Sequence, residues 1–367
     1  MDLAFLQPLY RHPGPFASLY LDVSRDTADA ARMIGIRWRD ARDDLDRAGA
    51  DTATLDAFEA TLNTLPPVEG RAGLALFGAG GETLLAETFP NPPSVTGSSL
   101  GSLPDVMPLA AARGEILPWM RVVVDHTGAD PGRITHGEID RRLGAEGHSE
   151  LPIHKAGRGV RSAPRYGQVA GLTWERNATE IAEAVTAMAE EAGAEIVVVA
   201  GDPQARPLLV DHLSARWRER VVQTDAGSDT LDRPTGIAVA ELADRRVSDL
   251  LDRYHAELSH NAAAGTGLAA VVAALQRAQV DTLLLVDERS STEQLWAGPE
   301  PVDVSLSADE LKAAGVTDPQ RVRADAALVR ALAGTDADLV LVQPDDAWLN
   351  GGVGAVLRFA DAATRHH

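Results

Sequence analysis

The chain of 367 residues contains no cysteine. This absence excludes a disulfide framework, a thiolate zinc site and a cysteine nucleophile. No apolar run approaches the roughly 20 residues of a membrane span, and the first residues, Met1 to Pro8, lack the basic start and sustained apolar stretch of a signal peptide. We therefore expect a protein of the cytoplasm that has no membrane partner.

Positive charge is also scarce. The 34 lysine and arginine residues face 54 aspartate and glutamate residues, which leaves a formal net charge of -20. A field of this sign repels phosphate, so any contact with RNA has to come from a local basic patch. The hydrophobic share of 45% and the charged share of 24% are ordinary for globular proteins, and the length allows several hydrophobic cores.

Hydrophobic periodicity predicts strands that alternate with helices, which indicates an α/β fold with mixed sheets covered by helices. The pattern suggests three domains, at residues 1–115, 116–260 and 261–367. The stretch 90–108, rich in proline, serine and glycine, predicts a loop, and the run Ala262-Ala-Ala-Gly-Thr-Gly267 predicts a linker. Strands are expected at 17–23, 73–78, 83–88, 119–125, 195–200, 220–224, 282–287 and 337–342, and helices at 28–48, 52–65, 174–192, 203–217, 236–259, 268–278 and 324–333.

One segment departs from the acidic character of the chain. Between Leu151 and Trp174 there are four basic residues and no acidic one. Glycines in the segment allow a tightly turned backbone, and the spaced arginines could meet successive phosphates. Composition alone favours the plainer interpretation, in which the arginines of a solvated loop pair with nearby carboxylates. The residues concerned are His154, Lys155, Gly157, Arg158, Gly159, Arg161 and Arg165.

Within this segment, the run Gly159-Val-Arg-Ser-Ala-Pro-Arg-Tyr166 resembles a loop of the archaeo-eukaryotic release factors and their bacterial relatives. In that family the middle domain carries Gly-Gly-Gln-Ser, followed by Ala, one residue, Arg and an aromatic residue. Here Val160 replaces the second glycine, and Arg161 replaces the glutamine that admits water to peptidyl-tRNA. The resemblance implies a loop that does not hydrolyse peptidyl-tRNA, and hence a protein that is not an enzyme and has no catalytic residue, cofactor or metal.

The end of the chain carries a second resemblance. The run Gly351-Gly-Val-Gly-Ala-Val-Leu-Arg-Phe359 is similar to the Gly-Gly-Ile-Gly-Ala-Ile-Leu-Arg-Tyr run that closes the carboxy-terminal domain of the same family. The implied architecture is a release-factor-like N-terminal domain, an RNase H-like middle domain and an L7Ae-like C-terminal domain. From the residues alone, the run is a glycine turn before a short apolar segment, so Gly351, Gly352 and Gly354 are expected to serve the fold.

Two flanking motifs narrow the resemblance. His154-Lys-Ala-Gly157 before the loop and Trp174-Glu-Arg-Asn177 after it are similar to the Balon-type ribosome hibernation factors. This implies a stress-response protein that occupies the A site of the 70S ribosome, is delivered by elongation factor Tu, and directs residues 1–115 toward the decoding centre. The loop 154–166 would then bind rRNA or tRNA through His154, Lys155, Gly157, Arg158, Gly159, Arg161, Ser162, Arg165 and Tyr166.

Other functions remain open at the level of sequence. One is ribosome rescue, in which peptidyl-tRNA is released through an unrecognised group. Another is a metal-dependent nuclease, because Asp125 and Asp202 follow predicted strands and could hold cations, although Asp202 is also well placed to cap a helix. Gly201 invites a nucleotide-binding hypothesis, but no Gly-x-Gly-x-x-Gly or Walker pattern accompanies it.

Overall fold

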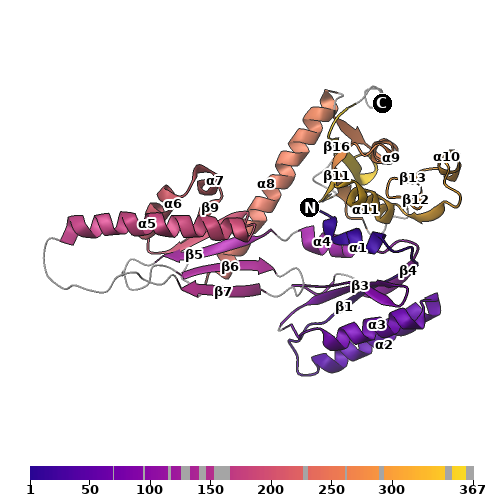
Figure 1. The fold of residues 1–367 in the computed structure, drawn as a ribbon, viewed down its shortest axis with the longest axis horizontal. Coiled ribbons are helices and arrows are strands. Elements are labelled where there is room, and N and C mark those ends of the chain that lie inside the picture. Colours follow the sequence, from indigo (N-terminus) through magenta and orange to yellow (C-terminus); the bar gives the residue numbers. More distant parts are fainter. Residues whose placement is uncertain are drawn as a thin grey trace. The chain divides into compact units, whose positions relative to one another are not determined.

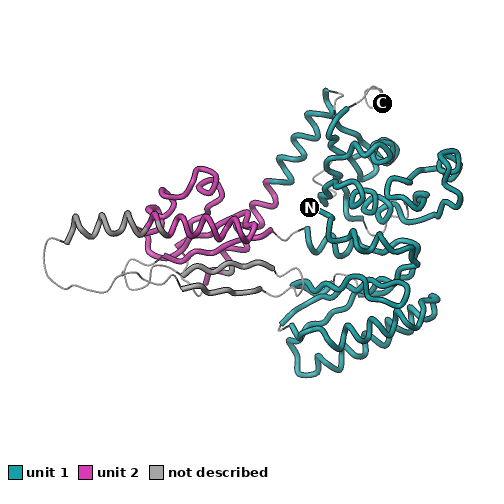
Figure 2. The backbone as a smooth tube through the Cα atoms, in the orientation of Figure 1, with its two compact units in different colours: residues 1–114, 142–144, 246–367 teal, residues 115–141, 145–245 magenta. Residues whose placement is uncertain are grey.

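In the computed structural model the chain forms two compact units (Figure 2). The first consists mainly of residues 1–114 and 246–367, and the second mainly of residues 115–141 and 145–245. The three domain boundaries expected from the sequence remain a prediction. The structure describes residues 1–68, 70–93, 96–114, 117–124, 133–139, 146–152, 166–225, 230–260, 263–288, 293–343 and 349–360.

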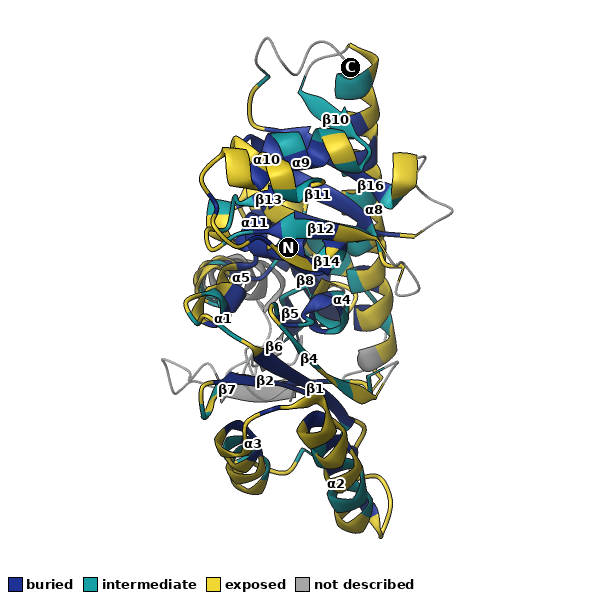
Figure 3. Ribbon diagram, turned by 90° about the vertical axis from the view of Figure 1, so that its right-hand side faces the viewer, coloured by how far each residue is buried: buried dark blue, intermediate teal, exposed yellow. Residues whose placement is uncertain are grey.

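An antiparallel sheet forms the first part of the first unit (Figure 1). Helices α2 and α3 cover one face, where Trp38, Ala41 and Leu45 recur at helical spacing and pack with Leu55 and Phe58. Buried and exposed residues lie on opposite sides of both helices (Figure 3). The strand order is β3-β2-β1-β4, with β1 Phe16–Asp22, β2 Gly73–Ala79, β3 Glu82–Phe89, β4 Gly97–Gly101, α2 Ala30–Ala48 and α3 Thr52–Thr64.

A second sheet is built from the last third of the chain. In the order β10-β16-β11-β15, β11 and β15 are parallel and the other pairs are antiparallel. A smaller antiparallel sheet, in the order β13-β12-β14, accompanies it. The elements are β10 Ala264–Thr266, α9 Leu268–Gln276, β11 Val280–Val286, β12 Gln294–Ala297, β13 Val304–Ser305, α10 Ala308–Ala313, β14 Gln320–Arg323, α11 Ala324–Thr335, β15 Asp338–Val342, η2 Asn350–Gly352 and β16 Val353–Leu357.

These two parts of the first unit share one apolar core. Leu6 and Leu9, which lie in η1 Ala4–Leu6 and α1 Gln7–Tyr10, are completely buried. The same cluster contains Phe77 of β2, Leu109 of α4 Met107–Gly114, and Leu332 of α11. The free face of the first sheet is therefore covered by short helices that also pack on the last third of the chain.

The second unit contains a five-stranded mixed sheet in the order β7-β6-β5-β8-β9, in which β5, β8 and β9 are parallel. Alternate residues of β5 enter different cores: Met120 and Val122 pack with α5 and α6, whereas Trp119 packs with Ala238 of α8. The elements are β5 Trp119–Val124, β6 Arg133–Ile139, β7 Glu146–Pro152, α5 Tyr166–Glu191, β8 Ile196–Gly201, α6 Ala205–His212, α7 Ala215–Arg218, β9 Val221–Gln223 and α8 Asp232–Ser259, which continues into the first unit.

The structure confirms the α/β class and corrects several local predictions. The stretch 90–108, expected to be a loop, contains β4, and the expected linker 262–267 contains β10. Both strands are poor in branched and aromatic residues, and backbone pairing with β1 and β16 determines their conformation. The helix expected at 203–217 is divided into α6 and α7. Helix α5 begins at Tyr166 and not near Trp174. Among the described residues, no helix is long and apolar enough to cross a membrane.

Polar contacts anchor α4 on the first sheet. The buried Glu87 of β3 lies 3.0 Å from Nε of Arg113, and the Arg113 guanidinium stacks 3.7 Å from the ring of Phe5. The Tyr20 hydroxyl donates to the carbonyl of Asp105 at 2.8 Å and accepts from the backbone N–H of Leu109 at 3.2 Å. These contacts place the helix so that its apolar side faces the shared core.

Replacing Glu87 by glutamine tests the buried ion pair. We expect Glu87→Gln to lower the free energy of unfolding by about 3 kcal/mol, because it removes the charge that faces the buried Arg113 guanidinium. The measurement is urea-induced unfolding followed by tryptophan fluorescence. Glu82→Gln is the matched control, since Glu82 is exposed at the start of the same strand. Equal effects of the two substitutions would contradict a role for the pair.

Candidate functional site

The scaffold of the second unit defines where the predicted basic loop is attached. Strand β7 ends at Pro152 and helix α5 begins at Tyr166, so the loop joins an edge strand to a helix of 26 residues, about 39 Å long. Tyr166 is the first residue of that helix. The other predicted site residues, His154, Lys155, Gly157, Arg158, Gly159, Arg161, Ser162 and Arg165, lie outside the described residues, so the sequence alone supports their proposed role.

The distal half of α5 is held firmly on the sheet. Ile181, Val185 and Ala189 recur at helical spacing and belong to the same buried cluster as Val197 and Val199 of β8. The helix ends before Gly193, which adopts a positive φ of 62°. The helix that follows the loop is therefore anchored over its last turns.

The opposite face of the sheet is joined to α8 by a buried arginine. Arg121 of β5 donates from Nε to Thr235 Oγ1 at 2.7 Å, and its guanidinium lies 4.3 Å from the ring of Trp119. Thr235 in turn donates to the carbonyl of Leu231 at 2.7 Å. Helices thus support the sheet on both sides, and the scaffold of the loop does not depend on α5 alone.

Gly201 and Asp202, at the carboxyl end of β8, both serve the fold. Gly201 has a φ of +102°, and a Cβ atom there would lie 2.0 Å from the carbonyl oxygen of Val124, so the position requires glycine. The Asp202 carboxylate accepts hydrogen bonds from the backbone N–H groups of Gln204, at 2.7 Å, and Ala205, at 3.2 Å. It therefore caps α6, as one of the two sequence interpretations expected.

The nuclease hypothesis gains no support from these contacts. Asp125, its other proposed carboxylate, lies outside the described residues. In the part of the chain that the structure describes, no group of three or more histidine, aspartate or glutamate residues is placed to hold a metal ion.

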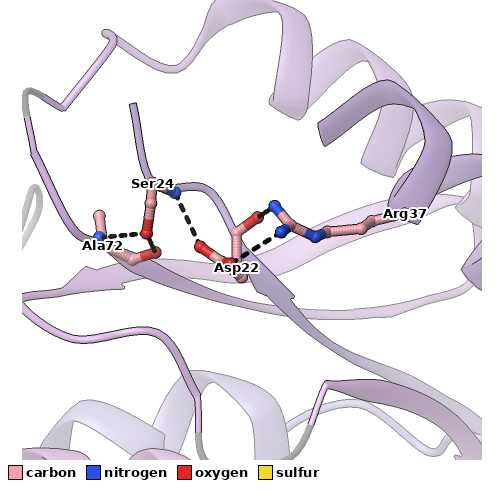
Figure 4. Close-up of polar contacts among 4 residues, drawn as sticks. All are labelled: Asp22, Ser24, Arg37 and Ala72. Carbon is pink, nitrogen blue, oxygen red and sulfur yellow. Dashed lines mark hydrogen bonds and ion pairs between the residues drawn. The ribbon is translucent and has the colours of Figure 1, made fainter. Parts of the chain in front are cut away.

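A polar network in the first unit was not recognised from the sequence (Figure 4). Arg37 of α2 donates to the carbonyl of Asp22 at 2.8 Å and forms an ion pair of 2.9 Å with its carboxylate. The same carboxylate accepts from the backbone N–H of Ser24 at 3.0 Å, and Ser24 Oγ accepts from the N–H of Ala72 at 3.1 Å. The network joins the end of β1 to α2 and to the segment before β2.

The network also affects the ionisation of Asp22. Burial acts to raise the pKa of the Asp22 carboxyl, but hydrogen bonds from Ser24 and the charges of Arg37 and Arg71 outweigh it and lower that pKa. The carboxylate is therefore stabilised in its ionised form. Its contacts are satisfied within the protein, which indicates a structural role.

The closing glycine run has the structural role expected from the sequence. Gly351 and Gly352 have φ values of 63° and 72°, and a Cβ atom at Gly354 would lie 2.8 Å from the hydroxyl of the buried Tyr254. Arg358 donates from Nη2 to the carbonyl of Thr335 at 3.0 Å and to the next carbonyl, at the end of α11. A basic side chain is favourable there because a helix C-terminus carries partial negative charge.

Comparison with known proteins supports the resemblance seen in the sequence. The model of bacterial archaeo-eukaryotic release factor family 2 matches residues 118–260. Two uncharacterized proteins of Mycobacterium tuberculosis, from strains CDC 1551 and H37Rv, are each 32% identical over 358 residues, which cover 95% of this chain and 94% of theirs.

Solved structures show a more distant likeness. Dom34 of Saccharomyces cerevisiae, described as a translation termination-like factor involved in RNA quality control, is 10% identical with a TM-score of 0.41, over 80% of this chain and 81% of its own. Pelota of Archaeoglobus fulgidus is 14% identical with a TM-score of 0.35, over 98% and 92%. At these scores the likeness carries no information about function.

The ionisation of Asp22 leads to a test by pH. Because the folded-state pKa is lowered, the stability that the carboxylate contributes is present above the unfolded value of about 3.9 and is lost as pH falls through the folded value. We expect Asp22→Asn to lower the urea midpoint at neutral pH and to differ less from the unsubstituted protein below about pH 4. Asp26→Asn, a change at an exposed nearby residue, is the control. A difference independent of pH would show that the ionised carboxylate is not the cause.

Proposed function

Because the chain belongs to the bacterial archaeo-eukaryotic release factor family, we propose that it occupies the A site of the 70S ribosome as a hibernation factor and does not hydrolyse peptidyl-tRNA. The observation that carries the proposal is the run Gly159-Val-Arg-Ser162. It keeps the position of the family's loop but has an arginine in place of the glutamine that admits water. The proposed absence of hydrolysis follows from that replacement.

The proposed binding to rRNA rests on the positive charge of the loop. The loop brings four basic residues and no acidic one to a protein whose formal net charge is -20. The acidic body is repelled by rRNA, so attraction is concentrated in the loop. Contacts to phosphate position a protein without reading sequence, and occupancy should therefore be independent of the message.

The proposal also covers how the protein lies on the ribosome and how it is delivered there. The first third of the chain faces the decoding centre, and elongation factor Tu brings the protein to the ribosome under stress.

Ribosome rescue is the runner-up function, and the missing glutamine weighs against it. A metal-dependent nuclease is the second alternative. Cleavage of RNA that requires Mg²⁺ and is lost in Asp125→Asn would favour it.

Co-sedimentation with 70S ribosomes from stationary-phase cells tests the proposal. We expect the protein to sediment with ribosomes, and we expect Lys155→Glu/Arg158→Glu to bind at least tenfold more weakly, with a salt dependence smaller by about 2 in the log–log slope. Arg216→Glu/Arg218→Glu is the matched control, since both residues are exposed in the same unit. No sedimentation of the unsubstituted protein would rule out the proposed function.

A peptide-release assay separates hibernation from rescue. Stalled ribosome–nascent-chain complexes incubated with the purified protein should keep their peptidyl-tRNA intact, because Arg161 cannot position water as the family's glutamine does. Val160→Gly/Arg161→Gln restores both family residues and should give measurable release. Peptide release by the unsubstituted protein would instead support the rescue function.

A further inference from the structure

The first unit contains a cavity that the proposed function does not use. Its volume is about 590 Å³, within the range of small-molecule sites, and residues from both ends of the chain line it. Tyr10, His12 and Phe16 come from the first third, and Pro299, Gln320 and Arg330 come from the last third. A ligand held there would bridge the two parts that share the apolar core.

Arg330 gives the cavity wall a buried positive charge. The residue is only 8% exposed, and its guanidinium donates to the backbone carbonyls of Gly298, at 2.8 Å, and Pro299. No carboxylate of the described residues lies within 4.0 Å of it. Burial lowers the pKa of Arg330, opposed in part by the interaction with Tyr10 and by the charges of Asp303 and Glu300. These carboxylates act from a distance, and the direct partners of the guanidinium are two neutral carbonyls, so among the described residues it has no counter-ion in contact.

Tyr10 adds a hydrogen-bond donor that lacks an acceptor. Its hydroxyl oxygen is buried and has no partner. Burial raises the pKa of this hydroxyl despite the nearby charge of Arg330, so the phenol is a neutral donor at physiological pH. A buried polar group without a hydrogen bond destabilises the folded state. An acceptor that also carries negative charge would satisfy Tyr10 and Arg330 together.

The rest of the lining indicates the kind of molecule. The lining also contains the exposed Arg11, the half-buried His12 and the exposed Asp318, so Arg11 adds a second positive charge to that of Arg330. Phe16 and Val322 provide buried apolar surface. The polar groups are too deeply buried to meet the backbone of a polynucleotide lying on the surface. This favours a small organic molecule.

We propose that this cavity binds a small organic oxyanion, with the anionic group beside Arg330 and Tyr10 and the organic part against Phe16 and Val322. A phosphate ester and a carboxylate both supply the required charge and acceptor oxygens. The cavity exists only when the first and last thirds of the chain are folded together. A ligand that binds there therefore stabilises the first unit by mass action. This inference does not depend on ribosome binding.

The test combines thermal unfolding with isothermal titration calorimetry of the full chain. The probes are adenosine monophosphate, inorganic phosphate and citrate, which distinguish a phosphate ester, the bare anion and a carboxylate. We expect at least one organic probe to raise Tm in a concentration-dependent manner. We expect Tyr10→Phe to raise the Tm of the free protein, because it removes an unsatisfied hydroxyl, and to weaken binding of that probe about tenfold.

A control and a second test keep the result specific. Tyr254→Phe makes the same chemical change at a buried tyrosine outside the cavity and should leave the affinity unchanged. His12→Ala removes another side chain of the lining and should weaken binding. The proposal is overturned if no organic probe raises Tm, if Tyr10→Phe leaves the affinity unchanged, or if only a short RNA binds at these residues.

Discussion

The apolar core shared by the first and last thirds of the chain is the constraint on which the first unit depends. Leu6, Leu9 and Leu109 pack from one side, and Leu332 and Leu339 from the other, with all five nearly or completely buried. The sheets that share this core could not expose such a face to water without losing the hydrophobic stabilisation that orders them. The buried Glu87–Arg113 ion pair makes this apolar packing specific, because it fixes the position of α4 on β3. Residues far apart in sequence thus form one body.

The second unit is organised differently. Its central strand β5 is buried on both faces, with Val122 entering the cluster of α5 and Trp119 that of α8. Two covered faces give the unit its own core, and the last turns of α5 are packed on it. In the proposed function, the basic residues between β7 and α5 attract a polyanion that the acidic remainder of the chain repels. The two effects together would restrict how the protein approaches it.

Regular apolar periodicity allowed much of this fold to be predicted. Helix α2 and strand β11 follow their patterns closely, because their own side chains bury the face that defines them. Strand β4 could not be predicted, since Gly97-Ser-Ser-Leu-Gly101 has little strand propensity and takes its conformation from the backbone of β1. The shared core and the Arg37–Asp22 ion pair could not be predicted either, because they depend on tertiary contacts that no local sequence pattern encodes. Of the candidate site, the sequence predicted the loop, and the structure supplied the cavity around Tyr10 and Arg330.

Several residues of the motifs singled out in the sequence are needed by the fold. Gly201 allows β8 to pass close to Val124, Asp202 caps α6, and Gly354 makes room for Tyr254. Arg358 satisfies carbonyls at the end of α11. Each of these residues makes a contact inside the protein that accounts for its presence in the sequence. The proposed function therefore rests on the amino-acid sequence of the loop between β7 and α5. There, in the proposed function, Arg161 stands where the family's loop has glutamine, so a group that binds phosphate replaces one that positions water. Under that proposal the replacement would both weaken hydrolysis and strengthen retention, the two properties that a hibernation factor requires.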